Sequence, residues 1–200
     1  KTYVSIGQEI GITNIQLAFA YGAIANGGYL LKPNIIKTIS KNDSITYSRK
    51  ITPIRHVCNL ETSKKILNLM NQVVNYGTAK NLNLNGYNVG GKTGTAQKFI
   101  NGEYSNKQFV SSFASIFPID RPRYVIIVSI DSPTYGNHWS YKSAVPVSRN
   151  IINRMIINDQ GLYSSNEQNI LANNKVKEES YNLEQHSLIY SNNNIDSNQI

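Results

Sequence analysis

The stretch "NVGGKTGTAQKF", Asn88 to Phe99, is the part of the chain on which the interpretation of the fold depends. Lys92 is a compact cation with three hydrogen-bond donors, suited to holding a carboxylate or polarising a hydroxyl. Thr93 and Thr95 add two hydroxyl groups, and Gly94 has no side chain, which lets a substrate backbone approach closely. Four residues are weak evidence by themselves, because a glycine-rich strand with a surface lysine is the simpler explanation of the tetrapeptide alone.

The same stretch is expected to be a β-strand from Val89 to Ile100, because Asn101-Gly102 behind it is a strong two-residue hairpin turn. Such a strand can take an extended peptide on its unpaired N–H groups, and one N–H can face a developing oxyanion. Strict alternation puts Lys92 and Thr95 on opposite faces of the strand. We therefore expect a twist or a bulge at the glycines, which would let both side chains reach one pocket.

The flanking sequence predicts helices and strands in a simple order. Thr13 to Asn26 is expected to be a largely buried helix, opened by a capping box of Thr13 and Gln16 and ended by Gly27-Gly28. The other expected elements are a hairpin of residues 32–40 and 44–50, a helix over Glu61–Asn75, strands over Phe109–Phe117 and Arg123–Asp131, and a helix over Val145–Asn158 with Val147, Ile151, Ile152 and Met155 facing inward. This order indicates an α/β chain of the α+β kind, an antiparallel sheet flanked by helices.

Length and composition limit the possible classes of protein. The chain has 200 residues, enough for one domain with a tail. The composition becomes polar and rich in Asn and Ser at residue 159, so residues 1–158 are expected to form the domain and residues 159–200 a disordered tail. The formal net charge is +8, but the basic residues are scattered, which favours a solvated basic surface and no nucleic-acid partner. Cys58 is the single cysteine, and no apolar stretch approaches the roughly 20 residues that span a bilayer.

Four segments in order and spacing resemble the transpeptidase domain of class B penicillin-binding proteins. They are "SIGQEIGITNIQLAFAYGAIANGGYLLKP" (residues 5–33), "VVNYGTAKN" (73–81), "GGKTGTAQK" (90–98) and "SSFASIFPIDRPRYVIIVSIDSP" (111–133). Lys-Thr-Gly is one of the three motifs of penicillin-binding proteins and serine β-lactamases. The resemblance covers about Ser5 to Met155 and implies the penicillin-binding protein transpeptidase or serine β-lactamase-like fold, with a five-stranded antiparallel sheet between helical layers.

The resemblance also implies a reaction and roles for four residues. The reaction is acyl transfer from the D-Ala-D-Ala end of a peptidoglycan stem peptide, through an acyl-serine, to an amine of a neighbouring strand. Lys92 would assist proton transfer and hold negative charge, the hydroxyl of Thr93 or Thr95 would bind the terminal carboxylate, and Gly94 would leave room for the substrate. The backbone N–H of Thr95 would form half of the oxyanion hole. No cofactor and no metal are implied.

The serine nucleophile of the family is missing from the sequence. No Ser-x-x-Lys occurs; two Thr-x-x-Lys runs, at 38–41 and 95–98, do not open a helix, and the Ser-x-Asn triplets at 148, 164 and 191 all follow the Lys-Thr-Gly motif instead of preceding it. The chain also opens without Met. We therefore expect a domain incomplete at its N-terminal side, with the nucleophile and the membrane anchor in the missing part, and no transpeptidase activity from this chain alone.

Other side chains that could carry chemistry are interpreted as packing or surface residues. His56, His138 and His186 share no metal-ligand spacing, and His138 beside Trp139 is expected to pack in a loop. Tyr104, Tyr135 and Tyr141 are expected to be exposed loop tyrosines instead of the lining of a sugar-peptide groove. The loop "SPTYGNHWSYKSAVPV" (132–147) departs from the family, in which a glycine pair precedes Ala-x-Pro.

Three hypotheses follow from the sequence. The first is a fragment of a peptidoglycan D,D-transpeptidase at the periplasmic face of the bacterial inner membrane. Its partners would be stem peptides, division or elongation proteins and, in the complete domain, β-lactams; a septal role is favoured only weakly over lateral wall synthesis. The second is a non-catalytic binding module or gene remnant, working with a partner chain that supplies the serine. The third, ranked lowest, is a β-lactamase-like hydrolase or β-lactam sensor.

Overall fold

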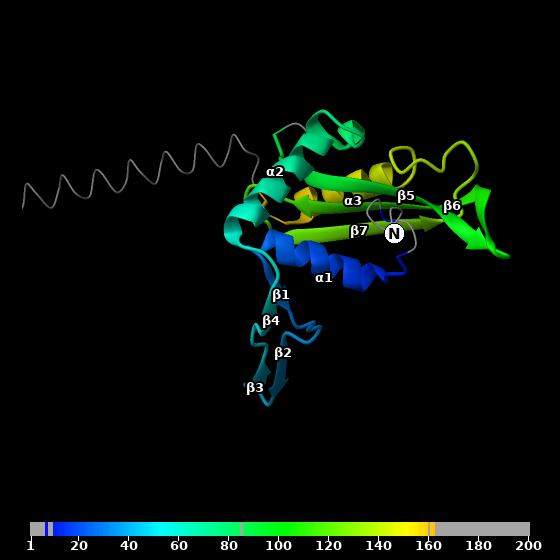
Figure 1. Ribbon diagram of the computed structural model, residues 1–200. Coiled ribbons are helices and arrows are strands. Elements are labelled where there is room, and N and C mark those ends of the chain that lie inside the picture. Colours follow the sequence, from blue (N-terminus) through cyan, green and yellow to red (C-terminus); the bar gives the residue numbers. More distant parts are fainter. Residues whose placement is uncertain (1–6, 8–9, 85, 160, 163–200) are drawn as a thin grey trace, which may run out of the picture. The chain divides into compact units, whose positions relative to one another are not determined.

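The computed structural model describes residues 7, 10–84, 86–159 and 161–162. The Asn- and Ser-rich tail lies almost entirely outside them, so its boundary at residue 159 stays a prediction. The elements are α1 (Asn14–Ala25), β1 (Tyr29–Leu31), β2 (Thr38–Lys41), β3 (Ser44–Ser48), β4 (Pro53–His56), α2 (Leu60–Asn75), the short 3₁₀ helix η2 (Lys80–Leu82), β5 (Gly90–Ile100), β6 (Glu103–Phe117), β7 (Tyr124–Asp131) and α3 (Ala144–Asn158), as Figure 1 shows.

The main sheet is antiparallel and has the strand order β5-β6-β7 among the described residues. Its register places Thr93 opposite Phe113, and Phe113 opposite Val128. The turn at Asn101-Gly102 joins β5 to β6, with φ values of 52° and 90° that fit a two-residue hairpin. The predicted α+β class with an antiparallel sheet is confirmed. Three of the five strands implied by the resemblance are present in this sheet within the described residues.

Helices cover both faces of the sheet (Figure 1). On one face, the Ser115 hydroxyl lies 3.1 Å from that of Ser148 on α3, and both serines are fully buried. On the other face, Ile116 of β6 packs with Met70 of α2 and with Ile119. Alternation along β6 explains this division, because odd-numbered side chains face α3 and even-numbered ones face α1 and α2.

Helix α1 begins and ends as predicted. The Thr13 and Gln16 side chains form the capping box. At the other end, Gly27 and Gly28 have φ values of 86° and 106°, and the Gly28 N–H donates to the Ala23 carbonyl at 2.7 Å. Left-handed glycines with this bond are a common helix stop.

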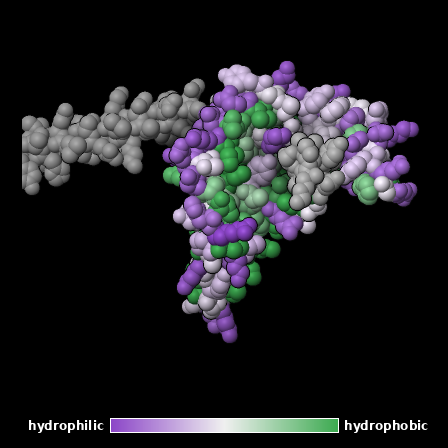
Figure 2. All heavy atoms as spheres, in the orientation of Figure 1, coloured by the Kyte–Doolittle hydropathy of each residue, from purple (hydrophilic) through white to green (hydrophobic). Residues whose placement is uncertain are grey.

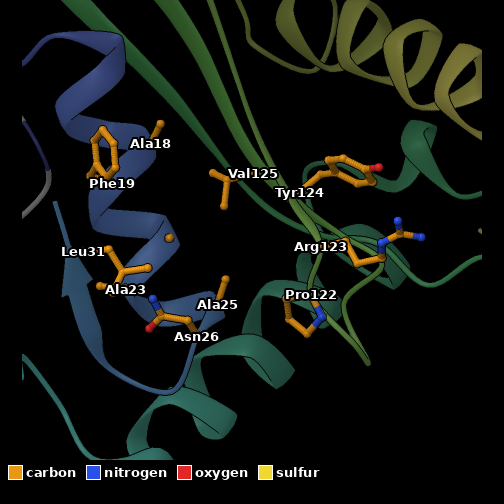
Figure 3. Close-up of a pocket in the computed structure, with 11 residues that line it drawn as sticks. Ala18, Phe19, Ala23, Ala25, Asn26, Leu31, Pro122, Arg123, Tyr124 and Val125 are labelled. Carbon is orange, nitrogen blue, oxygen red and sulfur yellow. The ribbon is translucent and has the colours of Figure 1, made fainter. Parts of the chain in front are cut away.

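The prediction that α1 is largely buried is wrong, since Ala23 is its one buried residue. The helix packs on the sheet and on β1 with part of its surface, and its other apolar side chains line open cavities. A cavity of about 340 Å³ between α1 and the start of β7 is shown in Figure 3, with Phe19 and Val125 among its lining residues. A second, of about 590 Å³, lies between α1 and the strands β1 and β4.

Helices α2 and α3 lie where the sequence predicts them, but α3 presents a different face. Val147 and Ile151 were expected to face inward and are 42% and 37% exposed. Ile152, also expected to face inward, is buried as predicted, and the other buried residues of this face are Val145 and Ser148. Their spacing of three and four residues defines one helical face, and the polar Ser148 in the middle of it hides this face from a hydrophobic pattern. No helix among the described residues combines the length and the apolar character needed to cross a lipid bilayer.

Residues 29–57 form a separate β structure, which we call the arm (Figure 1). The predicted hairpin is present as β2 and β3, and its turn at Asn42-Asp43 has the positive φ values of a tight hairpin, 49° and 60°. Its first strand starts at Thr38 instead of Lys32. Strands β1 and β4, which pair with each other, were not predicted, because they have three and four residues and β4 begins with proline.

Candidate functional site

The candidate tetrapeptide Lys92 to Thr95 lies on β5, at the edge of the main sheet. Strand β5 pairs with β6 on one side only, within the described residues. The pairing is continuous from Gly90 opposite Ile116 to Gln97 opposite Phe109, and the register shift comes after Gln97. An edge strand leaves part of its N–H and C=O groups free for another chain.

The expected bulge between Lys92 and Thr95 is not present. Because the pairing with β6 is unbroken, Lys92 shares a face with Gly94, whereas Thr93 and Thr95 project to the opposite face. The prediction that a distortion brings the two kinds of side chain together is therefore wrong. All four residues still line one cavity. This is possible because β5 is an edge strand, and the backbone of an edge strand is accessible from the side as well as from both faces.

This cavity has a volume of about 650 Å³. That size is typical of small-molecule and peptide sites. Its other walls come from the start of the chain, from α1 and from β6, with the lining residues Gly7, Ile10, Ile12, Leu17, Tyr21, Lys92, Thr93, Gly94, Thr95, Ala96, Ser112 and Ala114. Burial raises the pKa of Tyr21, which keeps its phenol protonated at neutral pH. The cavity thus combines an apolar wall with the polar edge of β5.

The Lys92 side chain is exposed to solvent. Its ammonium donates one hydrogen bond, to the Thr93 carbonyl at 2.9 Å. Since an ammonium has three donors, two remain for a ligand in the described structure. Ser112 is the serine that lines the cavity among the described residues, and its hydroxyl points to the Gly94 carbonyl at 3.4 Å. No hydrogen bond joins Ser112 to Lys92 in this part of the chain, so these two residues form no serine–lysine pair at the cavity.

The two threonine hydroxyls are held by partners that sequence reasoning missed. The Thr93 hydroxyl lies 2.9 Å from that of Thr78, just after α2. The Thr95 hydroxyl lies 2.9 Å from that of Ser140. Thr78 belongs to the "VVNYGTAKN" segment, which contributed to the family resemblance but was given no role in the site. Nothing in the sequence pointed to Ser140 except that its loop departs from the family pattern.

Ser140 joins the loop before α3 to β5 by three hydrogen bonds. Its hydroxyl donates to the Gly94 carbonyl, and its N–H donates to the Thr95 hydroxyl oxygen at 3.3 Å. Because the single hydroxyl proton of Ser140 is used on Gly94, Thr95 must be the donor in the bond between the two hydroxyls. Ser140 is 2% exposed, so water has little access to the serine end of these hydrogen bonds.

Replacing Ser140 by alanine is expected to lower the free energy of unfolding by about 1–3 kcal/mol, because the Gly94 carbonyl and the Thr95 hydroxyl each lose a hydrogen-bond partner. Urea unfolding of the 200-residue chain measures this. Ser143→Ala is the matched control: that hydroxyl donates to the Trp139 carbonyl at 3.1 Å in an exposed setting, and its removal should cost less than about 0.5 kcal/mol. Equal losses in the two variants would contradict the role given to Ser140.

The remaining candidates among the described residues pack or lie at the surface, and His186 lies outside the described residues. His138 is buried and stacks on Phe109, with ring centroids 4.2 Å apart, and it also contacts Tyr135 and Trp139. Its Nδ1 accepts a hydrogen bond from the Gly136 N–H, and this confirms His138 as a packing residue. The His56 ring packs against that of Tyr29, tilted by 43°, with centroids 4.6 Å apart. Tyr135 and Tyr141 are exposed in the loop before α3, as predicted. Tyr104 is exposed as well, but it lies on β6, where a loop was predicted.

Comparisons with known proteins agree with the geometry. Residues 1–153 match the family model of the penicillin-binding protein transpeptidase domain. The chain is 36% identical over 167 residues to a peptidoglycan D,D-transpeptidase FtsI homolog of Mesostigma viride, and it covers 28% of that protein. It is 37% identical over 150 residues to stage V sporulation protein D of Bacillus subtilis, and it covers 23% of that protein. The chain thus spans about a quarter of these relatives, which match 76% and 74% of it.

Solved structures show the same relation. Penicillin-binding protein 3 of Mycobacterium tuberculosis in complex with aztreonam superposes with a TM-score of 0.70 at 30% identity, over 80% of this chain and 38% of that one. The transpeptidase domain of Burkholderia pseudomallei penicillin-binding protein 3 gives 0.61 at 34% identity, over 72% of this chain and 42% of that one. From the matching family model, the relatives and the shared fold, we conclude that the chain belongs to the penicillin-binding protein transpeptidase domain family.

Proposed function

We propose that this chain is one part of a peptidoglycan D,D-transpeptidase and supplies the β5 wall of its active site. The observation that supports this best is the unbroken edge strand β5, which brings Lys92, Thr93, Gly94 and Thr95 to the border of one cavity of about 650 Å³. The relatives named D,D-transpeptidase support the reaction class. The complexes with ampicillin and aztreonam support β-lactams as mimics of the donor peptide.

In the proposed reaction, a serine attacks the carbonyl between two terminal D-Ala residues, and D-Ala leaves as the acyl-serine forms. An amine of a neighbouring stem peptide then attacks the acyl-serine, which forms the cross-link and frees the serine. Lys92 would move protons and hold negative charge beside the serine. The N–H of Thr95 would donate to the oxyanion of both tetrahedral intermediates.

In this proposal, the Thr93 hydroxyl is better placed than the Thr95 hydroxyl to bind the terminal carboxylate of the substrate. The Thr95 proton is directed at Ser140, inside the protein. The Thr93 hydroxyl has one hydrogen-bond partner among the described residues, the exposed Thr78 hydroxyl, and Thr93 is one of the residues that line the cavity. Its side chain projects to the face opposite Lys92, so a carboxylate that contacts both would lie over the open edge of β5. We therefore assign the terminal carboxylate of the substrate to Thr93 and the Lys92 ammonium, with the Thr95 hydroxyl released only if the Ser140 bond opens.

The proposal places the nucleophile outside these 200 residues, since Ser-x-x-Lys is absent from the sequence. The working enzyme would act at the membrane face where peptidoglycan is built, with stem peptides as substrates and cell-division or elongation proteins as further partners. A non-catalytic module that binds extended peptides on the open edge of β5 is the alternative, which the free edge supports.

A labelled penicillin separates these possibilities. The 200-residue chain is expected to form no covalent adduct, because a nucleophile and its base act as a unit and their loss removes nearly all catalysis. The same chain fused behind the upstream part of the Bacillus subtilis relative's transpeptidase domain is expected to be labelled. Labelling of the chain alone would contradict the external nucleophile. A folded fusion that stays unlabelled would favour the binding module.

A further inference from the structure

The arm, residues 29–57, is an ordered β structure without a core of its own. Every residue from Lys32 to Val57 is exposed. Its strands nevertheless have defined registers and a defined turn. Large aliphatic side chains are among the exposed ones; Ile35 is 95% exposed, Ile51 is 72% exposed and Ile45 is 67% exposed. Several large apolar side chains this exposed on one ordered segment are a feature of interaction surfaces.

The arm is also strongly basic. It contains the six cations Lys32, Lys37, Lys41, Arg49, Lys50 and Arg55, and a single carboxylate, Asp43. The arm lies wholly within the described residues 10–84, and no ion pair found in the described part of the chain involves one of its cations. Hydrophobic and hydrophilic side chains alternate along the visible side of the arm in Figure 2. The arm thus carries unpaired positive charge interleaved with exposed isoleucine.

Two backbone hydrogen bonds join the segments that carry Lys32, Lys37, Arg49 and Lys50. The Lys32 N–H donates to the Thr52 carbonyl, and the Arg49 N–H donates to the Lys37 carbonyl, each at 2.8 Å. Between them lies a cavity of about 520 Å³, lined by Lys32, Pro33, Asn34, Thr46, Tyr47, Ser48, Lys50 and Thr52. Two ammonium groups, three hydroxyls, a phenol and an amide in one cavity match a phosphate group, which accepts several hydrogen bonds.

We propose that the arm docks on a membrane surface that contains anionic phospholipid. Lys32 and Lys50 would contact a headgroup phosphate, and Ile35 and Ile51, which are close to these lysines in the sequence, would enter the interfacial region of the bilayer. Basic side chains near an anionic leaflet attract it, and their aliphatic stems lie along apolar surroundings. This inference does not rest on the proposed transpeptidase function, because no residue of the arm belongs to the β5 site.

A bilayer fits the arm better than a nucleic acid or an acidic protein. Nucleic-acid grooves combine cations with aromatic side chains on which bases stack. In the arm, the Tyr29 ring packs against His56 at a tilt of 43°, and the most exposed apolar groups are isoleucines and not aromatic side chains. An acidic protein would match the charge but gives no reason for the four-carbon side chains exposed next to the cations.

Vesicle co-sedimentation of the 200-residue chain tests the proposal. The chain is expected to bind vesicles of phosphatidylcholine with phosphatidylglycerol, to bind phosphatidylcholine alone much more weakly, and to dissociate as salt is raised. The double substitution Lys32→Gln and Lys50→Gln should weaken binding about 30-fold, since each cation near the surface contributes about fivefold. Ile35→Ser with Ile51→Ser should weaken binding to the same vesicles with the salt dependence kept.

The matched control is Lys80→Gln with Lys107→Gln, which removes the same charge from exposed positions outside the arm. It should change binding by no more than about twofold. Equal binding to both kinds of vesicle, or an equal loss in control and arm variants, would overturn the proposal. The proposal would also be overturned if the chain bound soluble polyglutamate as tightly as the anionic vesicles and the isoleucine substitutions left that affinity unchanged. That outcome would indicate an acidic protein as the partner. Circular dichroism of each variant verifies that the fold is intact.

Discussion

Replacing Lys92 by methionine is expected to slow acylation by a labelled penicillin about 10²- to 10⁴-fold in the fusion that completes the domain. Methionine keeps the length and apolar stem of the side chain and removes the ammonium. The proposed role of Lys92 is to move a proton and hold negative charge, and both need that group. Binding of the ligand before the chemical step should weaken as well, because Lys92 is also assigned to the terminal carboxylate.

The measurement is the rate of adduct formation at several penicillin concentrations, which separates binding from the covalent step. Lys98→Met is the matched control on the same strand. Its ammonium pairs with Asp131 at 2.7 Å outside the cavity, so the rate should change by no more than about threefold. Lys92 is exposed and makes one hydrogen bond, so its loss should leave the free energy of unfolding within about 0.5 kcal/mol. Unchanged acylation in a folded Lys92→Met fusion would remove Lys92 from the mechanism.

Substituting alanine for Gly28 is expected to lower the free energy of unfolding by about 3 kcal/mol or more. A Cβ at Gly28 would lie 1.8 Å from the carbonyl oxygen of Cys58, and the backbone φ of 106° is one that residues with a side chain rarely adopt. The backbone cannot move away, since Gly28 donates to Ala23 and accepts from Val57. This residue ends α1 and begins the arm, so both elements should loosen together.

Urea unfolding of the 200-residue chain measures the effect of Gly28→Ala. Gly22→Ala is the control, because Gly22 lies inside α1 and a Cβ there meets no atom within 4 Å. Alanine is the better helix former, so this variant should gain about 0.5–1 kcal/mol. A Gly28→Ala protein within about 1 kcal/mol of the parent would mean that the close contact with Cys58 is relieved at little cost.

Much of the fold was predictable because local signals were strong. The Thr13–Gln16 capping box, the Asn101-Gly102 turn and the apolar run of β7 each specify an element with few neighbours involved. Where tertiary packing decided, prediction failed. The buried face of α3 runs through Ser148, whose hydroxyl is satisfied by Ser115, and a hydrophobic pattern cannot include a serine that finds its partner on a distant strand.

In the candidate site, too, the features set by local sequence were predictable and those set by tertiary contacts were not. Lys92 to Thr95 stood out because their residue types are rare together and their neighbours resemble a known family. Ser140 could not be predicted, since it lies 45 positions beyond Thr95 and reaches it only through the folded loop. The continuous pairing of β5 with β6 could not be predicted either, because glycines permit a bulge without requiring one. Whether a bulge forms depends on the packing of the buried partner residues on β6.

The hydrogen bond from Ser140 to Gly94 has an electronic consequence for the proposed reaction. The Gly94 carbonyl and the Thr95 N–H are the two ends of one amide. A donor on the oxygen draws electron density along the conjugated O–C–N system and leaves the N–H hydrogen more positive, a cooperative gain of roughly 10–30% per bond. A buried serine on the loop before α3 would thereby strengthen, from behind, the donor assigned to the oxyanion.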